Sequence, residues 1–389
     1  MTRNLIICSD GTGNTFSENV SNVTRLVKAL ELCAPDRQLV FYDQGLGTNP
    51  KLVQAVKDYK SEGGVNRAGL IVLPAPRASK LIPPVARVAG LAFGYGLRDN
   101  VVEMYKALAE SYRDETDRVF LFGFSRGAFT VRVLAGLIYR CGLPPRELAH
   151  DRAAFDECFA EAYRVYEPHA EDCSRTEEFR KRYKVRDIEI QLLGIWDTVK
   201  SYGGIWPQSL PHLRHNPIVL RVRHALALNE RRSWFVPTSW GGIDIDKPNA
   251  ESIKPDARYA KQQVKELWFP GAHSDVGGGD READTSIIPF RWMLREAQRL
   301  DIILTEAGRR ELLVSDPPRS PQIHESLTWG WRLTEYFPRW ELDNSRRPPK
   351  RLFKSWSTGR RHPDKFRRGK EPLLYQSSKH GPEASDQGN

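Results

Sequence analysis

The sequence lacks the features of a membrane-spanning or a disulfide-stapled protein. Its longest uncharged apolar stretch, VAGLAFGYGL at 88–97, is too short to cross a bilayer. The opening MTRNLIICSDG turns acidic after a few apolar residues and has no small-residue cleavage site. No signal peptide is therefore expected, and a cytosolic protein is the default, with export by a signal-less route left open. The five cysteines are odd in number and form no C-x-x-C pair, which indicates reduced, packing thiols.

Motifs for phosphate and metal chemistry are incomplete as well. The stretch NLIICSDGTGN, residues 4–14, is an apolar run that ends in an acidic, glycine-punctuated loop. A phosphatase of the haloacid dehalogenase type would need a nucleophilic Asp two residues before Asp10, and Cys8 stands there. The loop has no Gly-Lys-Ser/Thr ending for nucleotide phosphates, and no H-E-x-x-H pair is present. We therefore expect no cofactor and no catalytic metal.

The chain does contain the material for a large α/β core. Of its 389 residues, 40% are apolar and ten are tryptophan, enough for a packed interior. Short runs rich in β-branched and aromatic residues alternate with helical patterns, which is typical of parallel strands with crossover helices. The prediction is an α/β fold with a mostly parallel central sheet and helices on both faces, which the serine motif described below makes α/β-hydrolase-like. Its strands are expected at 5–8, 39–42, 118–122, 187–193 and 264–269.

Residues 1–343 are expected to form one catalytic domain, with helical insertions at about 51–95 and 144–184. In the second insertion, four aromatic residues repeat on one helical face, as in a substrate wall or in ordinary packing: Phe155, Phe159, Tyr163 and Tyr166. Residues 344–389 are expected to form a basic C-terminal segment.

Basic charge is concentrated at 345–370. This segment has eleven Lys or Arg against Asp364 alone, and its excess equals the net charge of +10 of the whole chain. Interleaved aromatic residues fit contact with an anionic membrane or nucleic acid, whereas a solvated basic edge is the commoner fate of a charge run. We expect peripheral contact with an anionic membrane if the segment has a partner, and no nucleic acid.

A nucleophile motif stands between an expected strand and an expected helix. LFGFSRGAF contains Gly123-Phe124-Ser125-Arg126-Gly127, which matches G-x-S-x-G. In this motif the serine sits in a strained turn that lifts its Oγ above the sheet, and the flanking glycines allow helix and strand to approach closely. The alternative is a turn or helix-capping serine. The strand before it and the helix after it favour Ser125 as a nucleophile.

A serine nucleophile needs a histidine base and an acid that orients it. In this fold they follow the serine in the order acid, then histidine, each at a strand end. Asp197 ends the apolar run in DIEIQLLGIWDTV, and His273 follows the run in KELWFPGAHSDVGGG. The sequence therefore predicts a Ser125, Asp197, His273 triad.

Other histidines and acids are weaker candidates. His224 lies in RVRHALALNERR, which has a helical pattern, and the remaining histidines considered lie in polar connections: His150, His169, His212 and His215. Alternatives to Asp197 stay open at Asp244, Asp246 and Asp275. Asp275 is close enough to His273 in sequence to orient it or, with Asp197, to hold a cation.

An acyl-transfer site also needs two backbone N–H donors for the oxyanion. One follows the serine, at Arg126, and the other comes from a loop after a neighbouring strand. The DGTGN loop is expected to present the N–H of Gly11 or Thr12 there, with Asp10 bracing the loop or hydrogen-bonding near the site.

Taken together, these motifs resemble a known family. SDGTGNT, GFSRGA, GIWDTV, HALALNERR and WFPGAHSDVGGG occur in that order over about residues 4–295. The chain is thereby similar to the uncharacterised α/β-hydrolase domains that include the catalytic domains of type VI secretion phospholipase effectors of the first lipase class. The resemblance implies Ser125 as nucleophile, Asp197 as acid and His273 as base, and lipid ester hydrolysis as the activity.

The sequence thus predicts a serine-dependent ester hydrolase, lipolytic in character, that acts on an ester or lipid through an acyl-enzyme. The alternative is a non-catalytic protein of the same fold that binds membranes or nucleic acid through its basic segment.

Overall fold

The computed structural model describes part of the 389-residue chain. The described residues are 2–11, 20–45, 50–62, 66–74, 93–167, 173–199, 212–213, 216–232, 235, 237–240, 262–279, 283–314, 323–327, 339–343 and 350–354. All five cysteines fall within these ranges and carry free thiols. No described helix is both long and apolar enough to pass through a lipid bilayer.

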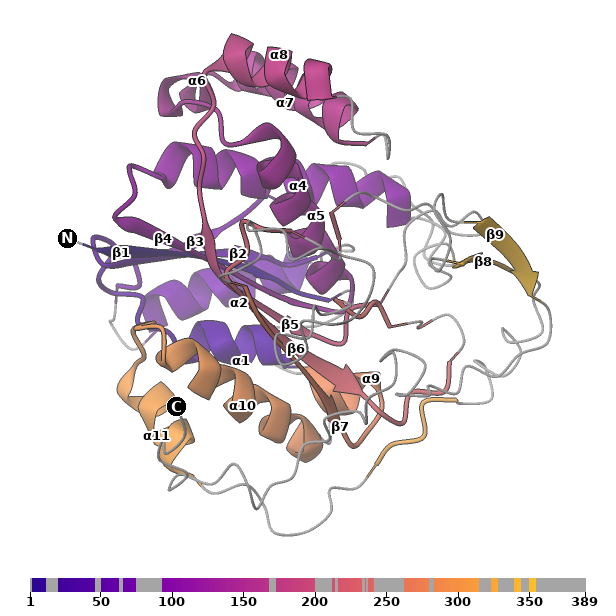
Figure 1. The fold of residues 1–389 in the computed structure, drawn as a ribbon. Helices are drawn as coiled ribbons and strands as arrows, with labels where there is room; N and C mark the ends of the chain where they lie inside the picture. Colours follow the sequence, from indigo (N-terminus) through magenta and orange to yellow (C-terminus); the bar gives the residue numbers. More distant parts are fainter. Residues whose placement is uncertain are drawn as a thin grey trace.

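A seven-stranded parallel sheet, in the order β3-β2-β1-β4-β5-β6-β7, forms the centre of the molecule (Figure 1). Its strands are β1 (Arg3–Ser9), β2 (Gln38–Asp43), β3 (Leu70–Val72), β4 (Asp117–Phe124), β5 (Ile190–Trp196), β6 (Arg221–Ala227) and β7 (Gln263–Phe269). The middle strands are buried on both faces, which explains their near-continuous apolar sequences. The predicted fold class is confirmed.

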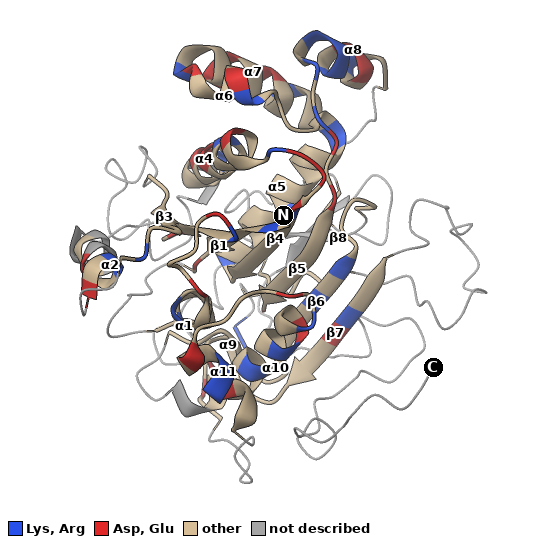
Figure 2. Ribbon diagram, turned by 90° about the vertical axis from the view of Figure 1, so that its left-hand side faces the viewer, with Lys and Arg blue, Asp and Glu red and all other residues tan. Residues whose placement is uncertain are grey.

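Helices cover both faces of the sheet (Figure 2). One face packs against α4 (Phe93–Ser111) and α5 (Arg126–Cys141), and the other against α1 (Asn22–Ala29) and α10 (Ile287–Gln298). Two more helices, α2 (Pro50–Ser61) and α11 (Glu306–Leu313), contribute apolar residues to this second cluster. Alternate residues of each strand supply the two clusters, Leu5 and Ile7 on one side and Ile6 and Cys8 on the other.

The region 144–184 forms a further layer above α4 and α5, built from α6 (Arg146–His150), α7 (Arg152–Tyr166) and α8 (Cys173–Tyr183) (Figure 1). Asp151 begins α7 by accepting hydrogen bonds from two first-turn N–H groups. The aromatic stripe of α7 is buried in the core cluster, with Phe155 and Tyr166 fully enclosed. It therefore packs the layer in place and does not line a substrate wall.

All five expected strands are present, with ends that differ by up to three residues. Two strands of the central sheet were not expected. β3 lies inside the predicted insertion at 51–95, so part of that region belongs to the central sheet. β6 includes His224, and the helical interpretation of that stretch is wrong. In this strand, Arg223 pairs with Glu296 of α10.

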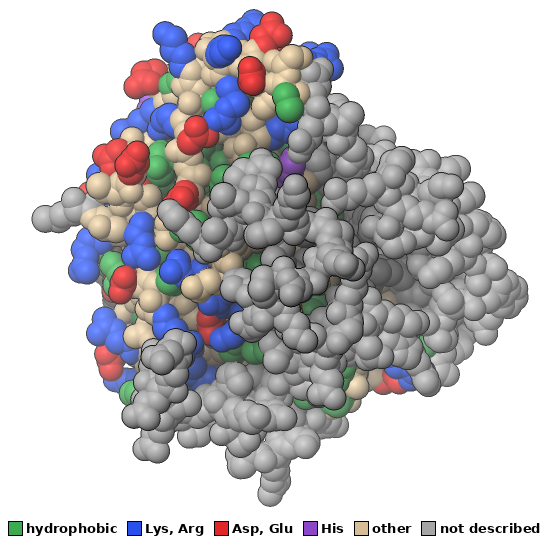
Figure 3. Space-filling view, viewed as in Figure 1, with side chains coloured by type: hydrophobic (Ala, Val, Ile, Leu, Met, Phe, Trp, Pro, Cys, Tyr) green, Lys and Arg blue, Asp and Glu red, His purple; other side chains and the backbone are tan. Residues whose placement is uncertain are grey.

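Near the end of the chain, β8 (Arg339–Asp343) and β9 (Lys350–Lys354) form an antiparallel pair. Most of the basic segment at 345–370 lies outside the described residues, as does Thr12. On the face shown in Figure 3, the described surface carries basic and acidic side chains interspersed.

Candidate active site

Ser125 sits in a strained turn between β4 and α5. Its φ of 57° and ψ of −117° place it in a region that side-chain-bearing residues rarely adopt. The turn requires glycine at Gly127, where a Cβ would stand 2.1 Å from the Ser9 carbonyl oxygen of β1. Strand, turn and helix thus meet as the G-x-S-x-G spacing predicts.

The three predicted triad residues lie in hydrogen-bond contact. His273 Nε2 is 2.8 Å from Ser125 Oγ, and His273 Nδ1 is 2.6 Å from Asp197 Oδ2. They come from the carboxyl ends of β4, β5 and β7, whose parallel alignment brings all three ends to one edge of the sheet. Because Nδ1 faces a carboxylate, it carries the ring proton, which leaves Nε2 as the acceptor for the serine hydroxyl.

The acid and the base are both buried. Asp197 is fully enclosed, and its second oxygen accepts a hydrogen bond of 3.0 Å from the Ala227 N–H. His273 is 7% exposed and contacts the rings of Phe124 and Phe235, with centroids 4.7 and 4.9 Å away. This burial lowers the pKa of His273 and outweighs the contact with Asp197, which acts to raise it. The imidazole is therefore neutral and able to accept a proton at neutral pH.

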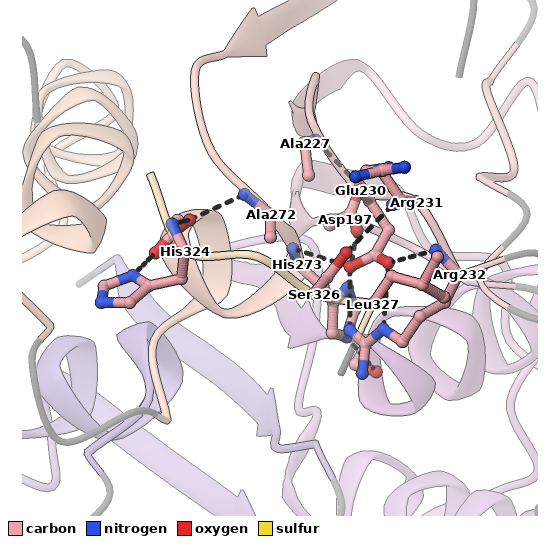
Figure 4. Close-up of polar contacts among 12 residues, drawn as sticks. Asp197, Ala227, Glu230, Arg231, Arg232, Ala272, His273, His324, Ser326 and Leu327 are labelled. Atoms are coloured by element: carbon pink, nitrogen blue, oxygen red, sulfur yellow. Dashed lines mark hydrogen bonds and ion pairs between the residues drawn. The ribbon is translucent and has the colours of Figure 1, made fainter. Parts of the chain in front are cut away.

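The loop directly after β6 accepts a hydrogen bond from the backbone of His273 (Figure 4). The Glu230 carboxylate accepts the backbone N–H of His273 at 3.1 Å and is paired with the Arg232 guanidinium at 2.8 Å. Burial acts to raise the pKa of Glu230, but the hydrogen bonds and charge of Arg232 outweigh it and hold the pKa at about 2. Asn229 accepts the N–H of Gly271 and so fixes the turn that precedes His273.

Sequence reasoning did not single out these supporting residues. The available signal was the run NER directly after an apolar strand, because polar residues at the carboxyl end of a parallel strand face the functional edge of the sheet. The helical interpretation of β6 concealed it. Arg232 also lies over the Phe235 ring, with its guanidinium carbon 3.6 Å from the ring centroid.

Asp275, the nearest alternative acid, has a different set of contacts. It lies in the short helix α9 (His273–Gly277), where its carboxylate accepts the Ala272 N–H at 2.8 Å. The same carboxylate accepts the His324 N–H at 3.1 Å and contacts the His324 ring (Figure 4). Asp275 therefore ties the helix to the segment 323–327, and Asp197 is the acid that contacts the His273 ring. Among the described residues, no three acids, histidines or cysteines gather as metal ligands.

The remaining candidates are distributed as follows. Asp244, Asp246, His169 and His215 lie outside the described residues. His150 is exposed on α6, and His212 packs edge-on against Tyr139, with ring centroids 4.7 Å apart. The structure therefore brings together the three residues that the sequence favoured, Ser125, Asp197 and His273.

The DGTGN loop begins beside Ser125, because Ser9 of β1 is in register with Gly123 of β4. Asp10 is buried, and one carboxylate oxygen accepts from three hydroxyl groups, those of Ser21, Thr24 and Tyr42, at 2.7–3.0 Å. Asp10 thus ties the end of β1 to the start of α1 and to β2.

Of the predicted oxyanion donors, Gly11 and Arg126 lie within the described residues. The Gly11 N–H donates to Asp10 Oδ1 at 2.6 Å, so this donor already has an acceptor. Thr12 lies outside the described residues. Arg126 begins α5 directly after Ser125, the position that the sequence predicts for the first donor. Burial lowers the pKa of the Arg126 guanidinium to about 10, which leaves it charged at neutral pH.

Comparison with known proteins gives a family match over most of the chain. Residues 3–296 match the family described as "T6SS, Phospholipase effector Tle1-like, catalytic domain". The uncharacterised protein YEL023C of Saccharomyces cerevisiae is 29% identical over 245 residues, which are 60% of this chain and 32% of the yeast protein.

Two solved structures are also similar. An uncharacterised protein from Pseudomonas aeruginosa is 18% identical with a TM-score of 0.40, over 80% of this chain and 48% of the other. A Tle1 effector, solved bound to the VgrG spike of the type 6 secretion system, is 20% identical with a TM-score of 0.24, over 72% and 52%. The chain therefore spans about a third of the yeast protein and about half of each solved chain.

Proposed function

We propose that this chain, which belongs to the family of Tle1-like phospholipase effector catalytic domains, is a serine-dependent hydrolase of lipid esters. The observation that carries the proposal is the contact chain from Ser125 Oγ through the His273 ring to Asp197. A serine hydroxyl at its ordinary pKa is a weak nucleophile, and such a contact chain is the arrangement that activates it.

Acylation begins when Ser125 Oγ attacks the ester carbonyl carbon. His273 Nε2 takes the hydroxyl proton, and the Asp197 carboxylate stabilises the resulting imidazolium through Nδ1–H. The carbonyl electron pair moves onto oxygen, where the Arg126 N–H and a donor from the DGTGN loop stabilise it. Collapse of this intermediate expels the alcohol, which leaves with the proton from Nε2 and gives an acyl-serine.

Deacylation repeats these steps with water. His273 Nε2 removes a proton from the water, whose oxygen attacks the acyl carbon. The bond to Ser125 Oγ then breaks, the proton returns to that oxygen, and a carboxylic acid is released. The base must be neutral at the start of each half-reaction, which agrees with the lowered pKa of His273.

The membership of a phospholipase effector family makes a phospholipid our proposed substrate. We also propose that the basic segment at 345–370 helps the protein to meet anionic membranes, and that the protein is cytosolic where it is made. Vesicle retention before and after removal of 345–389, and cell fractionation, test these two points.

The central experiment compares the wild type with Ser125→Ala on a panel of phospholipids and simple esters. Loss of hydrolysis and of labelling by a fluorophosphonate probe is expected, since the probe needs an activated serine. Ser111→Ala, at the end of α4, is the matched control and should behave as the wild type. Wild-type hydrolysis by Ser125→Ala would refute the mechanism. Absence of labelling in the folded wild type would instead favour the non-catalytic binding protein.

A further inference from the structure

Another acid–histidine pair lies within the sheet itself, on β6 and β7. His224 of β6 and Glu266 of β7 are in register, and His224 Nδ1 is 2.8 Å from Glu266 Oε1. His224 is fully buried. Because Nδ1 faces the carboxylate it carries the proton, and Nε2 accepts the backbone N–H of Thr198 at 3.3 Å.

Glu266 is held in one orientation by groups on both of its oxygens. Oε1 also accepts the N–H of Trp240 at 2.7 Å, and Oε2 accepts the Ser239 hydroxyl at 2.7 Å. Burial acts to raise the pKa of Glu266, but the hydrogen bonds from His224, Trp240 and Ser239 act to lower it, and the pKa lies below its usual value. The carboxylate is therefore ionised and fixes the His224 ring.

The group that His224 holds is the backbone directly after the proposed catalytic acid. Asp197 has a positive φ of 37°, a conformation that needs support from its surroundings. Before the turn, the Asp197 N–H donates to the Ala225 carbonyl at 2.7 Å. After it, the Thr198 N–H is fixed by His224, and the Thr198 carbonyl accepts the Thr238 N–H at 2.9 Å.

We infer that His224, oriented by Glu266, is a positioning residue that fixes the turn at Asp197 and so aims its carboxylate at His273. This inference rests on the proposed function. The Thr198 N–H needs an acceptor, so the neutral ring is the working form. The charged groups that face His224 are Glu266 and Asp197, which raise its pKa, and Arg132, which lowers it. Burial is the largest influence and lowers the pKa of His224 overall.

Two substitutions test the contacts of the two His224 ring nitrogens separately. His224→Asn keeps an amide near Glu266 and loses the acceptor at the Nε2 position, whereas His224→Gln places an amide oxygen near that position. We expect His224→Asn to lower kcat on a phospholipid or ester by up to about 100-fold, with little change in KM, because a displacement of about 1 Å has this effect on a catalytic group. His224→Gln should recover part of the loss.

The second measurement does not depend on turnover. Histidine ring signals followed by NMR during a pH titration report the pKa of His273, which the Asp197 contact raises. His224→Asn should move that pKa downward. The control is Asp117→Asn, which disturbs the buried Arg3–Asp117 pair. This pair lies at the amino ends of β1 and β4, away from the triad, so the substitution should leave the titration unchanged.

The outcomes are distinct. If His224→Asn matches Asp117→Asn in both kcat and the His273 titration, the inference is overturned and the proposed function stands. If Ser125→Ala hydrolyses like the wild type, the proposed function fails, while the titration still decides whether His224 positions Asp197. Should His224→Asn not fold, Glu266→Gln is the milder variant and must lower both kcat and the His273 pKa, or the inference is wrong.

Discussion

Gly127 offers a direct test of how closely the serine turn is built against the sheet. In Gly127→Ala, the new methyl carbon would lie 2.1 Å from the Ser9 carbonyl oxygen and 2.7 Å from that of Asp10, against about 3.4 Å for ordinary contact. Both neighbours are backbone atoms next to β1, and they cannot rotate away as a side chain would. The start of α5 and the end of β1 must therefore separate by about 1 Å.

That separation has two measurable effects. Forcing a methyl group into a packed interior costs about 1–3 kcal/mol in the free energy of unfolding, which urea denaturation measures. It also moves Ser125 relative to His273, and a displacement of about 1 Å lowers reactivity by about 100-fold. The rate constant for fluorophosphonate labelling measures this second effect at the serine itself.

The control is Ala128→Gly, in the next position of the same helix. It reduces helix propensity by about 1 kcal/mol and adds no atoms, so stability should fall while labelling stays near the wild-type rate. If Gly127→Ala is labelled as fast as Ala128→Gly at equal stability, the close approach of α5 to β1 does not position the nucleophile, and our reasoning fails.

Three further outcomes are expected. Asp197→Asn should lower kcat by about 10⁴-fold with the fold retained, because an amide favours the wrong ring tautomer; activity within tenfold of the wild type would contradict this. Fluorophosphonate labelling should fall on acidification with a midpoint below pH 6.5, since burial lowers the His273 pKa below its usual 6.5 and labelling needs the neutral base. A midpoint above 6.5 would oppose this. Asp10→Ala should lower the free energy of unfolding by roughly 1–3 kcal/mol in urea denaturation, because it removes the acceptor shared by three buried hydroxyl groups. Unchanged stability would show that Asp10 does not brace the loop.

The triad could be predicted from the sequence because each of its residues has a local sequence signal. Ser125, Asp197 and His273 each follow an apolar run, and the carboxyl ends of parallel strands share one edge of a sheet. The strained turn at Ser125 also leaves a pattern in the sequence, since the glycine at Gly127 is needed for the approach to β1.

The supporting residues Glu230 and His224 could not be predicted from the sequence, because their roles depend on partners far away in the chain. Glu230 acts on a backbone N–H 43 residues later, and His224 joins Thr198 to Glu266 across two neighbouring strands. Gly11 shows the same limit at short range, because its N–H is taken by the side chain of the preceding residue. Only the folded geometry decides which donor meets which acceptor.

The order of the strands bears on when the protein becomes active during folding. On one side of β4, the strands β5, β6 and β7 stand in the order in which they occur along the chain. His273 follows β7, which is the last of them. Ser125 and His273 are 148 residues apart, and such non-local pairings form late and slowly. A chain still being synthesised therefore contains Ser125 before it contains the base that the proposed mechanism needs, so unfinished chains are expected to lack the proposed hydrolase activity.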